Sequence, residues 1–231
     1  MSRDPAWRRN FRAHPDRADA LARYAALSQG YESSTSRIRE VRQRTLALLD
    51  LQPGETVLDV ACGSGAILPA LSAAVGPGGR VIGIEQSPEM VVLAERSAGH
   101  LANVSLFQQP VESLALPIQA DAALLSYTHD VLQSPQALAA LLRHLRPGAR
   151  IALAGLCMAP WWYGAVQNLW VLWGARHYLT TWQGLAAPWK QLEAAGVAVE
   201  LLGRHHAGTG YLALARVPTP VVQPPSCVDP R

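Results

Sequence analysis

The sequence predicts an α/β fold with a doubly wound, Rossmann-like sheet of seven strands, mostly parallel. Between residues 56 and 155, short apolar runs alternate with amphipathic segments across short connections. This alternation is typical of a parallel sheet with helices on both faces. Two later apolar runs, residues 198–203 and 210–217, flank the turn-forming stretch RHHAGT. They predict a C-terminal hairpin that adds one antiparallel strand.

The bulk composition fits one folded domain with additions. Of the 231 residues, 49% are hydrophobic and 16% are charged, which excludes wholesale disorder. The net charge is +3, and a basic cluster between Arg3 and Arg17 is expected to be a solvated chain end. Charges in the first twenty residues argue against a signal peptide, so a cytoplasmic location is expected.

Two helices are predicted before the sheet, at residues 17–29 and 35–50. In the second helix, Ile38, Val41, Leu46 and Leu49 recur at spacings of three to five residues, as one helix face requires. The stretch QPGE then ends the helix. Residues 1–50 are therefore predicted to form an N-terminal helical cap, followed by the main domain over residues 51–216.

The alternating region gives the remaining elements in order. The helix predicted at residues 87–99 is the best marked, because Ser87 can cap it, Pro88 fits its first turn and Gly99 follows its end. Strands are predicted at residues 56–61, 80–85, 104–109, 121–127 and 149–155, and helices at residues 65–75, 87–99 and 134–145.

The end of the chain differs from this pattern. Residues 160–195 are predicted to be a helical, aromatic insertion, and the tail from Val217, with its five prolines, to be disordered. Residues 151–175 carry no charge and could reach across a bilayer. Pro160 and several glycines interrupt this run, so integral membrane insertion is not expected.

The first strand leads into the glycine-rich loop VLDVACGSGAI. Ala61, Gly63 and Ala66 nearly match the dinucleotide pattern G-x-G-x-x-G/A, and Glu85 lies where a ribose-binding acid is expected. This pair fits either a nicotinamide cofactor or S-adenosylmethionine. Asp59 favours the second, because a carboxylate near a pyrophosphate is unfavourable and one near an ammonium and a sulfonium is favourable.

Four stretches in order then carry a family resemblance: VLDVACGSG, VIGIEQSPEMVVLAE, VESLALP and LLRHLRPGARIALAG. They resemble the motifs of class I S-adenosylmethionine-dependent methyltransferases, the ubiquinone/menaquinone-type group in particular, over about residues 51–155. The resemblance implies that S-adenosylmethionine is the cofactor and S-adenosylhomocysteine the product. No NPPY-like tetrapeptide follows the fourth strand, so nucleic acid is not expected as a partner.

The resemblance also implies roles for matching positions. The loop and Asp59 would hold the amino-acid part of the cofactor and Glu85 the ribose hydroxyls. Gln86, Met90, Val111 and Glu112 would lie around the adenine, and Ser126 would line the methionine end. The implied cofactor-binding residues are Asp59, Ala61, Gly63, Ser64, Gly65, Glu85, Gln86, Met90, Val111, Glu112 and Ser126.

Two positions depart from the family pattern. Ala61 replaces a glycine and is expected to be tolerated if its backbone φ is negative. Pro110 replaces an aspartate that often faces the adenine amino group, and it offers no side-chain acceptor.

Candidate catalytic residues follow the fourth strand in SYTHDVLQ. His129 is the best base, because its pKa lies near neutral pH, and Asp130 is an alternative base or an orienting group. A purely structural His129, capping a helix or bonding to backbone, is the competing interpretation. Tyr31 is expected to fold over the cofactor.

The segment after the fifth strand contains six of the seven tryptophans. With Tyr127, the side chains of Trp161, Trp162 and Tyr163 are predicted to line the substrate pocket, as a lid over an apolar or aromatic small-molecule acceptor. A packing helix, a homodimer face and a membrane-surface contact remain alternatives.

The sequence therefore predicts methyl transfer to a nitrogen or oxygen atom more readily than to carbon. An NAD-linked oxidoreductase and a non-catalytic cofactor-binding regulator or partner subunit are the alternatives. Three scattered cysteines give no metal-binding pattern, so no metal is expected.

Overall fold

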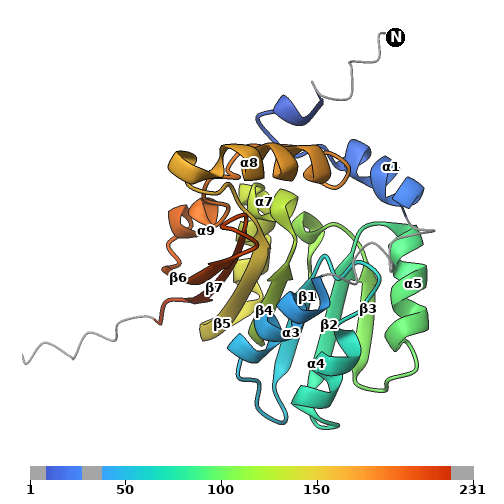
Figure 1. The fold of residues 1–231 in the computed structure, drawn as a ribbon. Coiled ribbons are helices and arrows are strands. Elements are labelled where there is room, and N and C mark those ends of the chain that lie inside the picture. The colour runs from blue at the N-terminus through green and yellow to red at the C-terminus, as the bar shows by residue number, and fades with distance from the viewer. Residues whose placement is uncertain (1–8, 28–37, 220–231) are drawn as a thin grey trace, which may run out of the picture.

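The computed structural model describes residues 9–27 and 38–219, and its centre is a seven-stranded sheet of order β3-β2-β1-β4-β5-β7-β6 (Figure 1). Strand β7 runs antiparallel to its neighbours β5 and β6, and the other pairings are parallel. The prediction of a mostly parallel sheet with one antiparallel strand is confirmed. The strands are β1 (Thr56–Val60), β2 (Arg80–Glu85), β3 (Val104–Gln108), β4 (Ala120–Ser126), β5 (Leu145–Leu156), β6 (Val199–His205) and β7 (Gly210–Arg216).

Helices cover both faces of this sheet (Figure 1). Alternate residues of β1 show why, since Val57 packs in the core cluster with α4 residues and Leu58 in the cluster with α7 residues. The helices are α1 (Arg17–Leu27), α3 (Arg39–Leu48), α4 (Leu68–Val75), α5 (Pro88–Ala98), α6 (His129–Leu132), α7 (Pro135–Arg143), α8 (Trp161–Ala175) and α9 (Lys190–Ala194), with short 3₁₀ turns η1 (Arg9–Phe11) and η4 (Val111–Ser113).

Two predicted helices differ in extent from the observed ones. Helix α4 begins at Leu68 rather than residue 65, because Gly63 and Gly65 have positive φ and belong to the loop. The insertion at residues 160–195 is not helical throughout. Residues 176–189 are irregular, and Gly184, with φ of +73°, and Pro188 both oppose a continuous helix there.

Helix α8 lies across the carboxyl ends of the strands, with α1 beyond its end (Figure 1). Both helices therefore stand over the edge where ligands of open α/β sheets bind. In the part of the chain that the structure describes, no helix is long and apolar enough to cross a membrane. Tyr31 and most of the proline-rich tail lie outside the described residues.

Candidate functional site

The loop after β1 is shaped by backbone conformations that glycine favours. Gly63 and Gly65 have φ of +58° and +73°. A Cβ on Gly65 would come within 2.9 Å of the Cα of Ala94 on α5, so the loop also needs glycine for close packing. Ala61 and Gly63 of this loop line a cavity at the carboxyl ends of β1 and β2.

Ala61 corrects an expectation about this loop. Its φ is +53°, whereas tolerance of a methyl group there was expected to rest on a negative φ. An L-residue in the left-handed region carries a steric penalty of about 1–2 kcal/mol. Tyr127, at the end of the adjacent strand β4, has φ of +60°. Two non-glycine residues at the cavity edge therefore hold strained backbone, as functional sites often do.

Ala61→Gly is therefore expected to stabilise the protein. Relief of the left-handed strain outweighs the greater entropy of glycine in the unfolded chain, and the net gain should be about 0.5 kcal/mol. Urea unfolding measures it. Ala66→Gly is the matched control, because Ala66 is exposed in the same loop and is not among the positive-φ residues. It should destabilise slightly, and equal effects of both substitutions would refute the strain at Ala61.

Two buried carboxylates lie at the ends of the first two strands. Asp59 is 3% exposed, and its Oδ2 has no hydrogen-bond partner among the described residues. Burial raises its pKa to about 7, Arg42 opposes this and Glu85 adds to it. Glu85 accepts hydrogen bonds from the backbone amides of Gly63, at 3.0 Å, and Ser87, at 2.8 Å. Burial also raises the pKa of Glu85, against these two amide donors.

A small cavity of about 80 Å³ lies between these carboxylates and β4. Of the predicted cofactor-binding residues, it is lined by Asp59, Ala61, Gly63, Glu85, Gln86 and Ser126. The hydroxyl of Ser126 is buried without a partner in the part of the chain described.

A larger cavity of about 390 Å³ continues from it past Ala61 and Gln86. Val111 and Glu112, the predicted adenine wall, line this second cavity, and Glu112 accepts a hydrogen bond from Ser134 Oγ at 2.8 Å. Ser64, Gly65 and Met90 are buried and line neither cavity. The structure thus brings most of the predicted cofactor residues together and leaves these three outside the cavity walls.

His129 and Asp130 begin helix α6 beside the small cavity. His129 Nε2 lies 2.9 Å from the carbonyl of Gln183, and its Nδ1 is buried without a partner among the described residues. Because a carbonyl only accepts, Nε2 carries the proton and Nδ1 keeps its lone pair. Burial lowers the pKa of His129 to about 4. Asp130 accepts hydrogen bonds from the amide and hydroxyl of Thr180, which suits an orienting group more than a base.

A third cavity, of about 200 Å³, adjoins the first and is lined by aromatic and aliphatic side chains. Tyr127 and His129 line both it and the Asp59 cavity. Sequence reasoning missed several lining residues, because the fold brings them from distant segments: Arg42 beside Asp59, and Tyr178, Leu179 and Tyr211 in the third cavity.

The predicted aromatic lid is not where it was expected. Trp161 and Trp162 are 84% and 68% exposed and line none of these three cavities. Tyr163 points toward Gly208 in the β6–β7 turn. The substrate-pocket assignment of these three residues is therefore corrected. Apolar composition alone does not tell a side chain that covers a pocket from one that faces outward.

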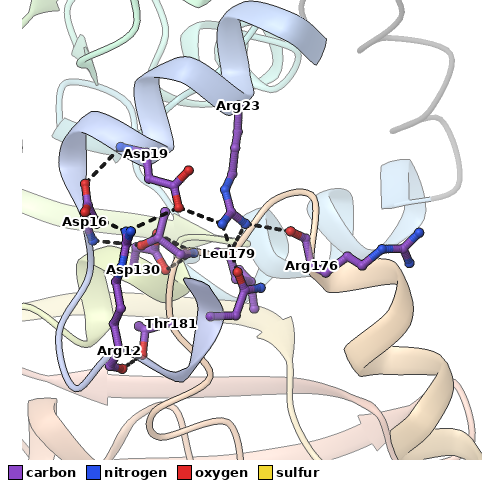
Figure 2. Close-up of polar contacts among 10 residues, drawn as sticks. Arg12, Asp16, Asp19, Arg23, Asp130, Arg176, Leu179 and Thr181 are labelled. Carbon is purple, nitrogen blue, oxygen red and sulfur yellow. Dashed lines mark hydrogen bonds and ion pairs between the residues drawn. The ribbon is translucent and has the colours of Figure 1, made fainter. Parts of the chain in front are cut away.

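The irregular segment after α8 covers the cavities instead, and a polar network holds it against α1 (Figure 2). Arg23 donates to the backbone carbonyls of Arg176 and Leu179 and pairs with Asp19 at 2.7 Å. Asp130 holds Thr180 from the α6 side. The N-terminal helix, the segment after α8 and the turn after β4 are thereby fixed to one another around the site.

Comparisons with protein families, curated proteins and solved structures all match the chain to methyltransferases. A family model described as "Methyltransferase domain" matches residues 57–148. The chain is 30% identical to 2-phytyl-1,4-naphtoquinone methyltransferase of Thermosynechococcus vestitus, over 65% of this chain and 68% of that one. It is 38% identical to nocamycin O-methyltransferase of Saccharothrix syringae, over 51% of this chain but only 43% of that one. A solved S-adenosylmethionine-dependent methyltransferase of Aquifex aeolicus superposes with a TM-score of 0.58 at 26% identity, over 76% and 89% of the two chains.

Proposed function

The chain belongs to the class I S-adenosylmethionine-dependent methyltransferase family, and we propose that it transfers a methyl group from S-adenosylmethionine to a nitrogen or oxygen atom of a small apolar or aromatic acceptor. One observation carries the proposal. The polar cavity beside Asp59 and the apolar cavity beside Tyr211 share Tyr127 and His129 in their walls. A cofactor site and an acceptor site therefore meet at the end of β4.

The residues present fit the cofactor. Asp59 Oδ2 and Ser126 Oγ are buried polar atoms without partners among the described residues, and such atoms are costly unless a ligand satisfies them. Asp59 would hold the ammonium group, Glu85 the ribose hydroxyls, and Val111 and Glu112 the adenine. When bound, S-adenosylmethionine supplies an electrophilic methyl group on a sulfonium.

The acceptor cavity supports an apolar, ring-shaped acceptor. Tyr24, Tyr127, Tyr178 and Tyr211 contribute to its lining together with aliphatic side chains and backbone. Flat aromatic surfaces favour stacked or edge-on contact with another ring. The naphthoquinone named for one relative is a compound of this kind.

His129 is the residue that we assign to proton removal from the acceptor. Gln183 fixes the imidazole through Nε2, which leaves the lone pair of Nδ1 to take up a proton. Since burial keeps the pKa near 4, the ring is neutral at working pH and is a weak base. It serves best for an acceptor that is already acidic, such as a phenolic hydroxyl.

Formation of S-adenosylhomocysteine with a panel of phenols, hydroxyquinones and aromatic amines tests this function. Turnover with none of them, despite cofactor binding, would favour the non-catalytic alternative. His129→Gln keeps a donor for the Gln183 carbonyl but removes the base. We expect it to lower kcat by about a hundredfold with the S-adenosylmethionine Kd within twofold. Unchanged kcat would leave His129 a structural role.

A further inference from the structure

Helix α8 presents an exposed apolar stripe that the proposed function does not use. Its four members, which are 63–68% exposed, are Trp162, Val166, Leu169 and Trp173. The helix buries the opposite side, through Gly164, Val171 and Ala175. We call these four exposed residues the α8 stripe.

The spacing of the α8 stripe is that of a helix-pairing seam. Its members are separated by four, three and four residues, which is the alternation of a and d positions in a heptad repeat. Val166 takes an a position and Leu169 a d position, and both are apolar, as the seam between paired helices requires. The stripe therefore fits another helix better than a flat surface.

The exposed area is large enough for a stable interface. Trp161 and Trp170 flank the stripe and are 84% and 70% exposed. With ~150 Å² for each of the four exposed tryptophans and smaller shares for Val166 and Leu169, the surface reaches ~800 Å². That is about the area each partner contributes to a standard interface, and it exceeds the ~300–600 Å² patches usual on monomers.

The charge and symmetry of the stripe indicate a second copy as the occupant. Residues 161–175 contain no charged side chain, so the surface can face itself without like-charge repulsion. In an antiparallel pair of α8 helices, Val166 faces Leu169 of the second copy, and Trp162 faces its Trp173. Both pairings are centred on the same point, between Gln167 and Asn168, as a twofold axis requires.

A bilayer is a poorer fit for the same surface. Helices that lie on membranes usually carry lysine or arginine on their polar face, and α8 has none. Arg176, which follows the helix, lies over the ring of its own Trp173 at 4.2 Å from the centroid. We propose that the chain forms an isologous dimer through the α8 stripe. This dimer does not depend on methyl transfer.

Sedimentation equilibrium of the full chain tests the dimer without cofactor or acceptor. The wild type should be dimeric at ~10 µM, and Leu169→Glu should raise the dimer Kd at least about a hundredfold, because two carboxylates enter an apolar interface. Val92→Glu, at an exposed valine on α5, is the control and should leave the Kd unchanged. Thermal unfolding confirms that both variants fold.

Complementary charges sharpen the test. Chains with Leu169→Glu and chains with Val166→Lys should each be monomeric, and their mixture should form a heterodimer at least tenfold tighter than either alone. A monomeric wild type at ~100 µM or a dimer that survives Leu169→Glu would overturn the proposal. A monomer that binds phosphatidylglycerol vesicles, with this binding abolished by Leu169→Glu, would also overturn it.

Discussion

Glu85→Ala is expected to weaken S-adenosylmethionine binding by at least about a hundredfold, because it removes the ionised acceptor for the ribose and each hydrogen bond to a charged group contributes about 1.5–3 kcal/mol. The carboxylate is 8% exposed and is held by the amides of Gly63 and Ser87. These two donors fix both oxygens at the cavity edge before any ligand arrives. Isothermal titration calorimetry with S-adenosylmethionine measures the loss.

The alanine variant also leaves two buried amides unpaired, so part of its effect could come from a distorted loop. Glu85→Gln separates the two causes. The glutamine keeps the volume and a carbonyl acceptor but loses the charge and one acceptor oxygen. It should fold with a stability closer to wild type and still bind the cofactor about tenfold more weakly. Wild-type affinity in both variants would remove Glu85 from the ribose site.

The fold could be predicted because each element carries its own signal. Strand and helix periodicities, caps such as Ser87 and breakers such as the QPGE stretch act over a few residues. These local signals therefore do not depend on the tertiary contacts that the rest of the chain makes. The hairpin and its antiparallel strand followed from the same local patterns, and family membership followed from four motifs in order.

The candidate site was predicted less completely, for two physical reasons. Arg42, Tyr178 and Tyr211 reach the cavities from segments far apart in sequence, so no local spacing marks them. The sign of φ at Ala61 depends on how the loop turns between β1 and α4. The presence of an alanine in the sequence does not indicate which sign φ takes.

The tryptophans of α8 show a third limit. An apolar residue can face a pocket, the core or a partner, and these alternatives differ in tertiary placement rather than in composition. The spacing of three and four residues is visible in the sequence and places these side chains on one face of α8. Whether that face is buried or exposed depends on which side of α8 packs against the domain.

Asp59→Asn is expected to stabilise the folded protein while it weakens cofactor binding. Asp59 has a pKa of about 7 when folded, against 3.8 as its ordinary value. Between these values the folded state keeps a proton that the unfolded state loses, so stability falls as pH rises and the penalty is complete above about pH 7. Asparagine avoids that penalty. The gain in free energy of unfolding should approach a ceiling of roughly 4 kcal/mol above pH 7 and vanish below about pH 4.

Binding should move in the opposite direction, because the ammonium group favours the ionised form of Asp59. In the wild type, the affinity for S-adenosylmethionine should fall about fivefold from pH 7 to pH 6, with proton uptake by the free protein and proton release on binding. Asp59→Asn should bind at least tenfold more weakly at pH 8 and lose this pH dependence. Glu95→Gln, at an exposed glutamate on α5, controls for a general loss of negative charge and should change neither property. The stability gain of Asp59→Asn over the wild type should be larger at pH 8 than at pH 4. An equal gain at both pH values would show that burial does not raise the pKa of Asp59. A site that gives up stability to bury a carboxylate whose Oδ2 has no partner among the described residues is one shaped for a cationic ligand.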